Sequence, residues 1–314
     1  MIKPLNKEQP DIIVIGGPTT SGKTNIGVIL AEEMPAVIIN ADAMQMYHEI
    51  PIISGQPTRE EKRNIPHELY GVLPVATHGS VFIWLEMVCK QIDAVRKAGK
   101  TPILIGGTGM YIASLYKGIS PVPAVSLEVK KRVRSDFELL GNERFYELLL
   151  IKDPQIKEHL HVGDSQRMVR AMEVLEETGE SLYLFQKMPA SLFYSDDQFK
   201  LFFLELPREK LYDRCNKRFV AMVEAGAIAE VKNLDGLGLD PNLPAMRAHG
   251  VPELLHYIHE TIPLDKAIET AQKNTRHYVK RQFTWFKHQL PQATRINAED
   301  PHKAVQEIRK LCLL

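Results

Sequence analysis

Three short apolar runs in the first third of the chain are bounded by Gly, Asp or Pro and predict buried β-strands. They span residues 11–16, 36–40 and 101–106 and are rich in Ile and Val, as is typical of parallel strands that are covered on both faces. Helical patterns separate them, at residues 23–34 and 80–99, where apolar residues recur at helical spacing. This alternation predicts βαβ units and therefore an α/β fold with a parallel sheet.

A fourth apolar run, residues 200–206, comes almost a hundred residues after the third, so a segment is inserted between them. From residue 126 to about residue 188 the sequence has only helical periodicity. We therefore predict a P-loop NTPase-like parallel sheet flanked by helices, with a helical insertion domain over residues 120–195. The core domain would then consist of residues 1–119 and 196–314.

Composition narrows the class of protein. Hydrophobic residues make up 44% and charged residues 25% of the 314 residues, which excludes disordered, fibrous and membrane-embedded chains. Lys plus Arg equals Asp plus Glu at 39 each, so binding to a polyanion must come from local patches of positive charge.

The cysteines and the start of the chain bear on the cellular compartment. Cys89, Cys215 and Cys312 stand far apart, which indicates neither a disulfide framework nor a thiolate zinc site. The polar start and the brief apolar run at residues 12–15 lack the length of a signal peptide or a spanning helix, so we expect a cytoplasmic protein without a membrane partner.

A phosphate-binding motif follows the first predicted strand. Residues 17–24 read GPTTSGKT and match G-x-x-x-x-G-K-[ST] between a strand and a helix. Its glycines let backbone N–H groups and the helix N-terminus face an anion, while Lys23 supplies a charge and Thr24 a hydroxyl for Mg²⁺. A turn whose glycines only relieve packing would not explain Lys23 followed by Thr24. We expect a diphosphate or triphosphate to bind to Gly17, Pro18, Thr19, Thr20, Ser21, Gly22, Lys23 and Thr24.

Two more segments follow predicted strands at the same edge of the sheet, where ligands bind in such folds. Asp42 follows the second strand, and it could orient a metal, act as a general base or cap the next helix. Residues 106–111, GGTGMY, follow the third strand and offer close backbone approach and the hydroxyl of Thr108. The alternative for this segment is a tight turn without a ligand.

Each of two groups of cationic residues either binds a ligand or belongs to a helix surface without a binding role. Arg214 and Arg218 are four apart on a helix predicted over residues 208–225, so they either clamp phosphates or are solvated helix charges. Residues 273–288 hold five Lys or Arg, two His and no acid, interleaved with four aromatic residues. That strip suits an RNA loop, or it is an amphipathic helix with a basic outer face and an aromatic inner face.

Taken together, these segments resemble the tRNA dimethylallyltransferase family, also called tRNA isopentenyltransferases, along nearly the whole chain. Many P-loop proteins share the phosphate loop, whereas the full set in this order is specific. Cys/His pairs at zinc-finger spacing are not found in the sequence, which indicates the bacterial type. The resembling segments are GPTTSGKT (17–24), NADAMQMY (40–47), PH (66–67), GGTGMY (106–111), DSQRMVR (164–170), AMEV (171–174), TG (178–179) and KRQFTWF (280–286).

The resemblance implies an activity and its substrates. The loop would bind the diphosphate of dimethylallyl diphosphate, and the acceptor would be N6 of the adenosine just 3′ of a tRNA anticodon. Asp42 would be the general base that accepts a proton from N6, and Thr108 would help to hold the target base. Thr24 with Mg²⁺ and Lys23 would stabilise the departing diphosphate. The partner would be the tRNA anticodon stem-loop, gripped by the insertion domain, and we expect a monomer.

The resemblance also implies contacts to tRNA. Ala43, the segment at residues 66–69 and the segment at residues 247–252 depart from the family pattern, which affects tRNA selection more than catalysis. The implied contacts are Asp42, Ala43, Met44, Gln45, Thr108, Lys130, Gln166, Arg167, Met168, Val169, Arg170, Arg247, Ala248, His249, Gly250, Val251, Pro252, Lys280, Arg281, Gln282, Phe283, Thr284, Trp285, Phe286 and Lys287.

Two other function classes share parts of this pattern. A small-molecule kinase of the adenylate or shikimate type has a P-loop, a carboxylate after the second strand and arginines on a lid helix, and it would depend on a nucleotide. A nucleotide switch or an RNA-binding module without chemistry would use the loop only to regulate affinity, but the guanine-reading N-K-x-D motif is missing from the sequence.

Overall fold

The computed structural model describes residues 11–312, so the polar start of the chain lies outside the described residues. The chain divides into two compact units. The larger unit runs to Tyr116 and resumes at Phe193, and the smaller unit is Lys117–Leu192.

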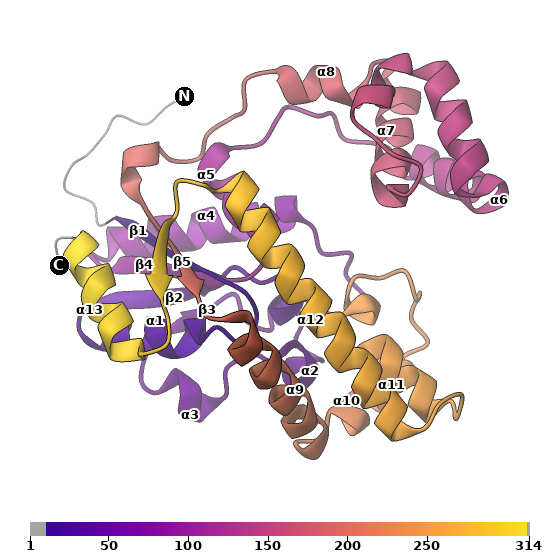
Figure 1. The fold of residues 1–314 in the computed structure, drawn as a ribbon. Helices are drawn as coiled ribbons and strands as arrows, with labels where there is room; N and C mark the ends of the chain where they lie inside the picture. The colour runs from indigo at the N-terminus through magenta and orange to yellow at the C-terminus, as the bar shows by residue number, and fades with distance from the viewer. Residues whose placement is uncertain (1–10, 313–314) are drawn as a thin grey trace. The chain divides into compact units, whose positions relative to one another are not determined.

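A six-stranded sheet lies at the centre of the larger unit (Figure 1). Its order is β3-β2-β4-β1-β5-β6, and each neighbouring pair is parallel. Ile13 of the central strand lies between Ile103 and Lys200 of its two neighbours. The strands are β1 (Ile12–Gly16), β2 (Ala36–Asn40), β3 (His67–Glu68), β4 (Thr101–Gly106), β5 (Phe199–Glu205) and β6 (Thr294–Asn297). The predicted α/β class with a P-loop NTPase-like parallel sheet is confirmed.

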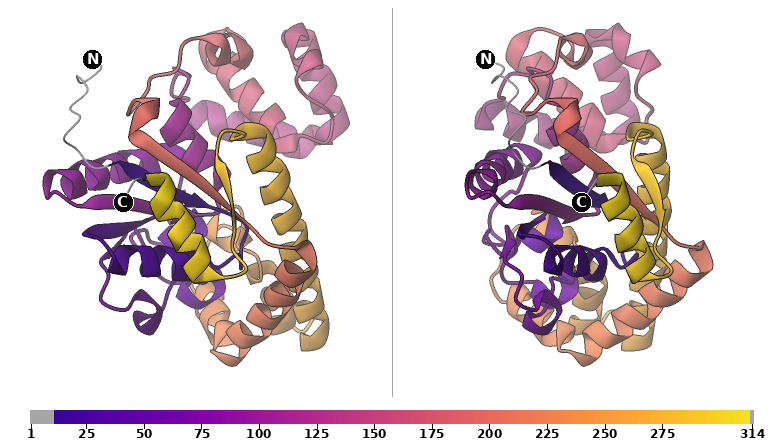
Figure 2. Two further views of the ribbon diagram at one scale, coloured as in Figure 1. Left: turned by 60° about the vertical axis from the view of Figure 1, so that its left-hand side comes forward. Right: turned by 90° about the vertical axis from the view of Figure 1, so that its left-hand side faces the viewer.

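Helices cover both faces of this sheet (Figure 2). Helices α1 and α13 share a buried apolar cluster with one face, to which Ile13 and Ile38 belong. Helix α4 packs on the other face, where Trp84 is fully buried and donates to the Asn40 carbonyl at 2.8 Å. The helices of the larger unit are α1 (Lys23–Glu32), α2 (Pro51–Ser54), α3 (Arg59–Lys62), α4 (Val81–Lys97), α5 (Gly109–Lys117), α9 (Arg208–Glu224), α10 (Ala227–Asp235), α11 (Val251–Ile258), α12 (Leu264–Gln289) and α13 (Pro301–Cys312).

The helices α9, α10, α11 and α12 form a second apolar cluster of the larger unit. Phe219, Val231, Leu254 and Ala271 are buried in it, each from a different one of these helices. The α2 residue Ile53 joins the same cluster. This cluster holds the helices of the carboxyl-terminal half against the segment that follows β2.

The smaller unit is helical, as the periodicity predicts. Its helices are α6 (Leu127–Lys152), α7 (Ser165–Thr178) and α8 (Leu182–Lys187), with a 3₁₀ turn at Pro154–Glu158. Gly141 has a φ of 69° and kinks α6. Phe145, Leu149 and Met168 are fully buried between α6 and α7. In residues 11–312 no helix is both long and apolar enough to cross a membrane.

Most element boundaries agree with the sequence pattern. Strands β2 and β4 have the predicted bounds, β1 begins one residue later than predicted, and β5 begins and ends one residue earlier. Helix α4 begins after Ser80, whose hydroxyl accepts a hydrogen bond from the Ile83 N–H at 3.3 Å. Strands β3 and β6 were not predicted, because β3 is two residues long and β6 buries only Ile296.

Candidate active site

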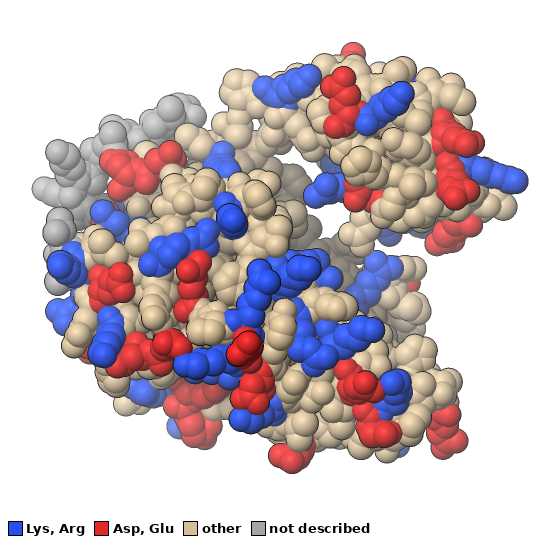
Figure 3. Space-filling view, viewed as in Figure 1, with Lys and Arg blue, Asp and Glu red and all other residues tan. Residues whose placement is uncertain are grey.

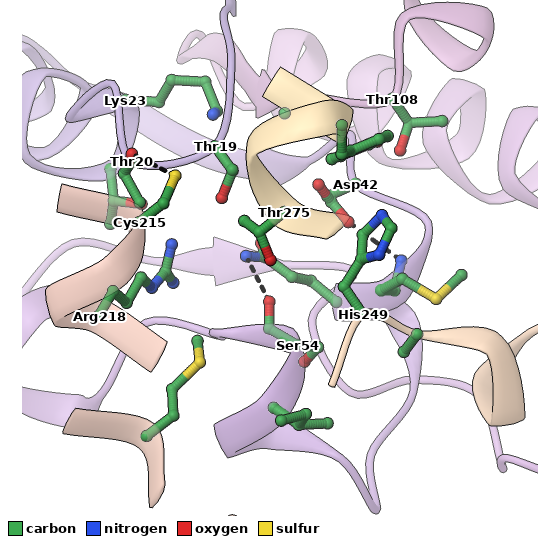
Figure 4. Close-up of a pocket in the computed structure, with 18 of the residues that line it drawn as sticks. Thr19, Thr20, Lys23, Asp42, Ser54, Thr108, Cys215, Arg218, His249 and Thr275 are labelled. Atoms are coloured by element: carbon green, nitrogen blue, oxygen red, sulfur yellow. Dashed lines mark hydrogen bonds between the residues drawn. The ribbon is translucent and has the colours of Figure 1, made fainter. Parts of the chain in front are cut away.

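A cavity of about 660 Å³ lies at the carboxyl ends of β1, β2 and β4 in the larger unit (Figure 4). Its walls come from the phosphate loop, from the segments that follow β2 and β4, and from α9 and α12. The structure therefore brings together the three segments that the sequence places at one edge of the sheet. It also adds Cys215 and Thr275, which the motifs do not indicate, and Tyr278, one of the four aromatic residues in the basic strip at residues 273–288.

The phosphate loop curls between β1 and α1. Gly22 has a φ of 89° and Thr20 a φ of 62°, both in the left-handed region. The Ser21 N–H donates to the Pro18 carbonyl at 3.2 Å, and the Lys23 ammonium donates to the same carbonyl at 2.7 Å. Lys23 therefore arches over the loop and presents its charge to the cavity.

Burial controls the acidity of Lys23. Its pKa is lowered from 10.5 to about 8, mainly because burial disfavours the charged form; the nearby Asp42 carboxylate raises the pKa and the charge of Arg218 lowers it. An anion bound in the loop would favour the charged ammonium, so anion binding and protonation of Lys23 are linked.

Two arginines of α9 lie beside the loop. The Arg218 guanidinium donates to the Gly55 carbonyl at 3.0 Å, and burial lowers the pKa of Arg218. Arg214 is exposed and its guanidinium lies 3.4 Å from the Thr20 carbonyl. Because both line the cavity, the predicted pair at helical spacing faces the same space as Lys23.

The position of the Arg218 side chain requires a glycine at residue 55, because the guanidinium lies close to the Gly55 backbone. A Cβ at Gly55 would lie 1.9 Å from the Arg218 Nη2, and its φ is +67°. We expect Gly55→Ala to displace Arg218 and to weaken the binding of inorganic pyrophosphate about tenfold, which calorimetry measures. Gly238→Ala is the matched control, because Gly238 has a φ of +59° with nothing within 4 Å. It should cost about 1–2 kcal/mol of backbone strain and keep the affinity. Equal affinities of the two variants would contradict this role of Arg218.

Asp42 is held by hydrogen bonds on its own backbone. Its N–H donates to the side-chain oxygen of the fully buried Asn40 at 2.8 Å, and the Asn40 amide donates back to the Asp42 carbonyl at 2.9 Å. One carboxylate oxygen accepts from the Met44 N–H at 3.0 Å. Asp42 thus makes a local backbone contact, as the capping interpretation expects, and at the same time lines the cavity as a general base must.

Thr108 lies next to Asp42 across the sheet edge. Its hydroxyl accepts a hydrogen bond from the Ala43 N–H at 2.9 Å, and its own N–H donates to the Ala41 carbonyl at 3.3 Å. The strand ends of β2 and β4 are thereby joined beside the cavity. Figure 4 shows the Thr108 hydroxyl and the His249 ring on the same side of the cavity as the Asp42 carboxylate.

His249 and Tyr278 form an aromatic wall at this acidic side. Their ring centroids are 4.9 Å apart. Burial lowers the pKa of His249, and burial together with the Asp42 charge raises the pKa of Tyr278. Both groups are therefore neutral at physiological pH and add no charge to this side of the cavity.

The cavity has two chemically different ends (Figure 4). Lys23 and Arg218 lie on one side and Asp42 lies on the other, with apolar side chains such as Met222 in the walls. Such a site binds an anion at its cationic end and accepts a proton at its acidic end. An apolar group joined to the anion fits between the two ends.

The donor set fits a magnesium ion held mainly by a bound phosphate group. Residues 11–312 contain no group of three or more His, Cys, Asp or Glu that could hold a metal ion. Thr24 lines the cavity in the first turn of α1. Mg²⁺ commonly takes one or two protein ligands and completes its shell with substrate phosphate oxygens and water.

The predicted tRNA-contacting residues of α12 divide between its two faces. Lys280, Arg281, Thr284 and Lys287 are exposed, and Figure 3 shows Lys and Arg gathered where Figure 1 draws α12. The aromatic residues point inward: Phe283 and Phe286 both pack against Phe203, and Trp285 lies against Gly109. Helix α12 thus has the basic outer face and aromatic inner face of an amphipathic helix, in which Phe286 is buried and Phe283 and Trp285 are partly exposed.

The other predicted contacts also include buried residues. In the segment at residues 247–252, Arg247 is exposed, whereas Ala248, Gly250 and Val251 are buried and His249 lines the cavity. In the smaller unit, Met168 is buried, Lys130, Val169 and Arg170 are partly buried, and Gln166 and Arg167 are exposed. Ala43, Met44 and Gln45 line the cavity next to Asp42, and Pro252 is partly exposed.

Some residues that position the site belong to no recognisable sequence motif. Glu230 of α10 is 9% exposed, and its two oxygens accept from the Ile52 and Ile53 N–H groups at 2.8 Å each. This fixes α2, whose following residue Gly55 accepts from Arg218 and from Gln45. An isolated Glu in a helix pattern does not indicate such a role.

Comparison with known proteins identifies related sequences. The family model described as IPP transferase matches residues 45–289, and the model described as isopentenyl transferase matches residues 10–68. The protein called tRNA dimethylallyltransferase from Ehrlichia canis is 44% identical over 284 residues, covering 90% of this chain and 94% of the relative. The protein of the same name from Wolbachia pipientis is 41% identical over 297 residues, covering 94% and 98%.

Comparison with solved structures identifies proteins of the same kind. A tRNA isopentenylpyrophosphate transferase from Bacillus halodurans matches with a TM-score of 0.71 at 28% identity, covering 97% of this chain and 96% of that one. A eukaryotic dimethylallyltransferase acting on tRNA matches with a TM-score of 0.77 at 26% identity, covering 94% and 75%.

Proposed function

The chain belongs to the tRNA dimethylallyltransferase family and is therefore a prenyltransferase, and from this premise we propose the reaction and the roles of its residues. The enzyme transfers the dimethylallyl group of dimethylallyl diphosphate to N6 of the adenosine 3′-adjacent to the anticodon, giving N6-isopentenyladenosine and diphosphate. The observation that carries this proposal is one cavity with cations at one end and Asp42 at the other.

Asp42 acts as the general base. The N6 lone pair of adenine is delocalised into the ring, so the nitrogen is a weak nucleophile and needs a carboxylate close to it as positive charge develops. The N6–C1 bond forms as the C1–O bond breaks, the bonding electron pair leaves with diphosphate, and the N6 proton passes to Asp42. Thr108, which is anchored to the Ala43 N–H, holds the target base beside Asp42.

The cationic end stabilises the leaving group. Diphosphate departs only if its growing charge is neutralised, and Lys23, Arg218 and Arg214 line the space where it would lie, together with Gly22 and Thr24 at the start of α1. Thr24 would hold Mg²⁺, which when bound neutralises charge on the diphosphate oxygens. Charge neutralisation and proton transfer are thus assigned to opposite ends of one cavity.

The acceptor is the anticodon stem-loop, bound by local positive charge. The target adenosine must leave its stack to reach the cavity. The exposed face of α12 and the residues of the segment at 247–252 line or adjoin the way to Asp42, and the insertion domain at residues 120–195 grips the arm through residues such as Lys130 and Arg167. We propose that the enzyme is a monomer.

A stem-loop substitution tests the acceptor. The protein is incubated with Mg²⁺, radiolabelled dimethylallyl diphosphate and an unmodified anticodon stem-loop that carries adenosine or guanosine 3′ of the anticodon. We expect label in the adenosine stem-loop alone. Label in both, or in neither while full-length tRNA is labelled, would place the acceptor elsewhere in the tRNA. The family match does not favour the kinase alternative, which would need ATP instead of the prenyl donor.

The cations on α12 give a prediction of their own. Exchanging Lys280 and Arg281 for Ala should weaken tRNA binding and reduce the slope of log affinity against log salt by about 1 for each phosphate that the protein no longer neutralises. The double change Lys97→Ala and Lys100→Ala is the control, because both are exposed: Lys97 ends α4 and Lys100 directly precedes β4, whose amino end is opposite the cavity edge. A slope equal to wild type in the α12 variant would return Lys280 and Arg281 to the solvated-helix interpretation.

A further inference from the structure

Gln282 joins two loops of the candidate active site from within α12. Its side chain is 4% exposed. Its Oε1 accepts from the N–H of Thr19 in the phosphate loop at 2.9 Å, and its Nε2 donates to the carbonyl of Gly107 at 2.9 Å. One amide group therefore bridges the segments that follow β1 and β4.

This bridge requires close approach at Gly107. A Cβ at that position would lie 2.3 Å from the Gln282 Nε2. Gly107 directly precedes Thr108, whose hydroxyl accepts from the Ala43 N–H beside Asp42. Tyr278, one turn earlier on α12, also interacts with both Gln282 and Thr108. Gln282 thus reaches the acidic end of the cavity through one hydrogen bond and the cationic end through the other.

The contact at Thr19 sets the first half of the phosphate loop. Pro18 has no N–H, the Thr19 N–H is bound to Gln282, and the Ser21 N–H is bound to the Pro18 carbonyl. The orientation of the later N–H groups, from Gly22 onward, follows from how this first half is held. A small shift of α12 would therefore reorient the donors that face the diphosphate.

The same turn of α12 carries exposed cations. Lys280 and Arg281 immediately precede Gln282 and are exposed to solvent, while Gln282 is buried and bound to the phosphate loop. A ligand that binds Lys280 and Arg281 on the exposed face of α12 therefore contacts the same helix turn whose Gln282 holds the phosphate loop.

We propose that Gln282 is a positioning residue that couples tRNA binding on α12 to diphosphate binding in the loop, an inference that rests on the proposed function. Each ligand then favours the arrangement of α12 that the other one needs. Because such coupling is reciprocal, tRNA strengthens diphosphate binding by the same factor by which diphosphate strengthens tRNA binding.

Calorimetry of inorganic pyrophosphate, with and without a saturating unmodified anticodon stem-loop, measures that factor. We expect the stem-loop to tighten pyrophosphate binding to the wild-type protein by at least about fivefold. Gln282→Met keeps the side-chain length and removes both hydrogen bonds, so its factor should fall below about twofold. Gln272→Met is the matched control: Gln272 lies on the same helix and donates to the Asn216 carbonyl at 3.1 Å, away from the loop. It should keep the wild-type factor.

Two results would overturn the proposal: a wild-type factor of one, or a wild-type factor retained in Gln282→Met. Should Gln282→Met fail to fold, amide hydrogen exchange of the wild-type protein decides. Exchange in residues 17–24 should slow when the stem-loop is added without pyrophosphate, and unchanged exchange would refute the coupling. Prenyl transfer to the stem-loop by the wild-type protein is measured alongside, so a failure of coupling in an active enzyme is distinct from a failure of the proposed reaction.

Discussion

Asp42→Asn is expected to lower kcat by about 10²–10⁴-fold and to leave the KM of both substrates nearly unchanged. Asn has the same shape, and its side-chain oxygen can still accept from the Met44 N–H, as the Asp42 carboxylate does at 3.0 Å. It cannot accept the proton that N6 loses. The effect therefore belongs to the chemical step, and single-turnover measurement at saturating substrates isolates it.

Asp240→Asn is the matched control for this change. Asp240 also accepts a hydrogen bond from the N–H two residues ahead, that of Asn242 at 2.8 Å, but it lies outside the cavity lining. Its kcat should equal that of wild type. If Asp42→Asn retained a near wild-type rate, the Asp42 side chain would serve only its local backbone hydrogen bond, as that of Asp240 does, and another group would have to take the proton.

Lys23→Ala should lower kcat/KM for dimethylallyl diphosphate by about 10²–10³-fold, because it removes a preorganised charge at the leaving group. The Lys23 ammonium lies within the loop, 2.7 Å from the Pro18 carbonyl. Its removal leaves the loop with backbone N–H groups but without a side-chain charge to bind the diphosphate. Steady-state kinetics with varied prenyl donor at saturating tRNA measures the loss. An unchanged kcat/KM would remove Lys23 from the reaction.

The pH dependence of the same group offers a second readout. The pKa of Lys23 is lowered to about 8 by burial, so the ammonium is charged below pH 8 and loses its proton above it. Pyrophosphate binding to the wild-type protein should therefore weaken as pH rises above about 8, by up to about tenfold per pH unit. Lys23→Arg keeps its charge at these pH values and supplies the background titration of pyrophosphate itself. Identical pH profiles of the two proteins would contradict the assignment.

The parallel sheet was predictable because its strands differ sharply from their surroundings. The β1, β2 and β4 residues are all buried, and each strand contains an unbroken run of apolar residues that ends at a glycine or a polar residue. The edge strands lack that contrast. In β6 only Ile296 is buried and its neighbours are polar or exposed, so its pairing with β5 depends on the tertiary structure.

The parts of the candidate site that short, local sequence motifs encode were predictable. The phosphate loop and the strand ends at Asp42 and Thr108 follow from short motifs and from the rule that ligands bind at the carboxyl ends of strands. The side chains that support them do not. Gln282 and Glu230 are single polar residues in amphipathic helices, and only the packing of α12 and α10 against the site gives each its backbone partners.

The aromatic residues of α12 show the same limit. Their spacing among Lys and Arg agrees equally with RNA stacking and with a buried helix face. Phe286 is 2% exposed and packs against Phe203, whereas Phe283 and Trp285 are partly exposed. The rings lie mainly on the inner side of the helix, and Lys280, Arg281 and Lys287 lie on its exposed side. Periodicity alone did not separate these alternatives, because an amphipathic helix and an RNA-binding strip both alternate basic and aromatic residues.

One measurement tests the central claim most directly. The purified protein is incubated with Mg²⁺, dimethylallyl diphosphate and unmodified tRNA, the tRNA is digested to nucleosides, and mass spectrometry determines whether adenosine has gained a dimethylallyl group. A parallel incubation contains ATP in place of the prenyl donor. We expect prenylated adenosine with the prenyl donor and without ATP. Unmodified adenosine, together with phosphate transfer from ATP to a small acceptor, would contradict the account.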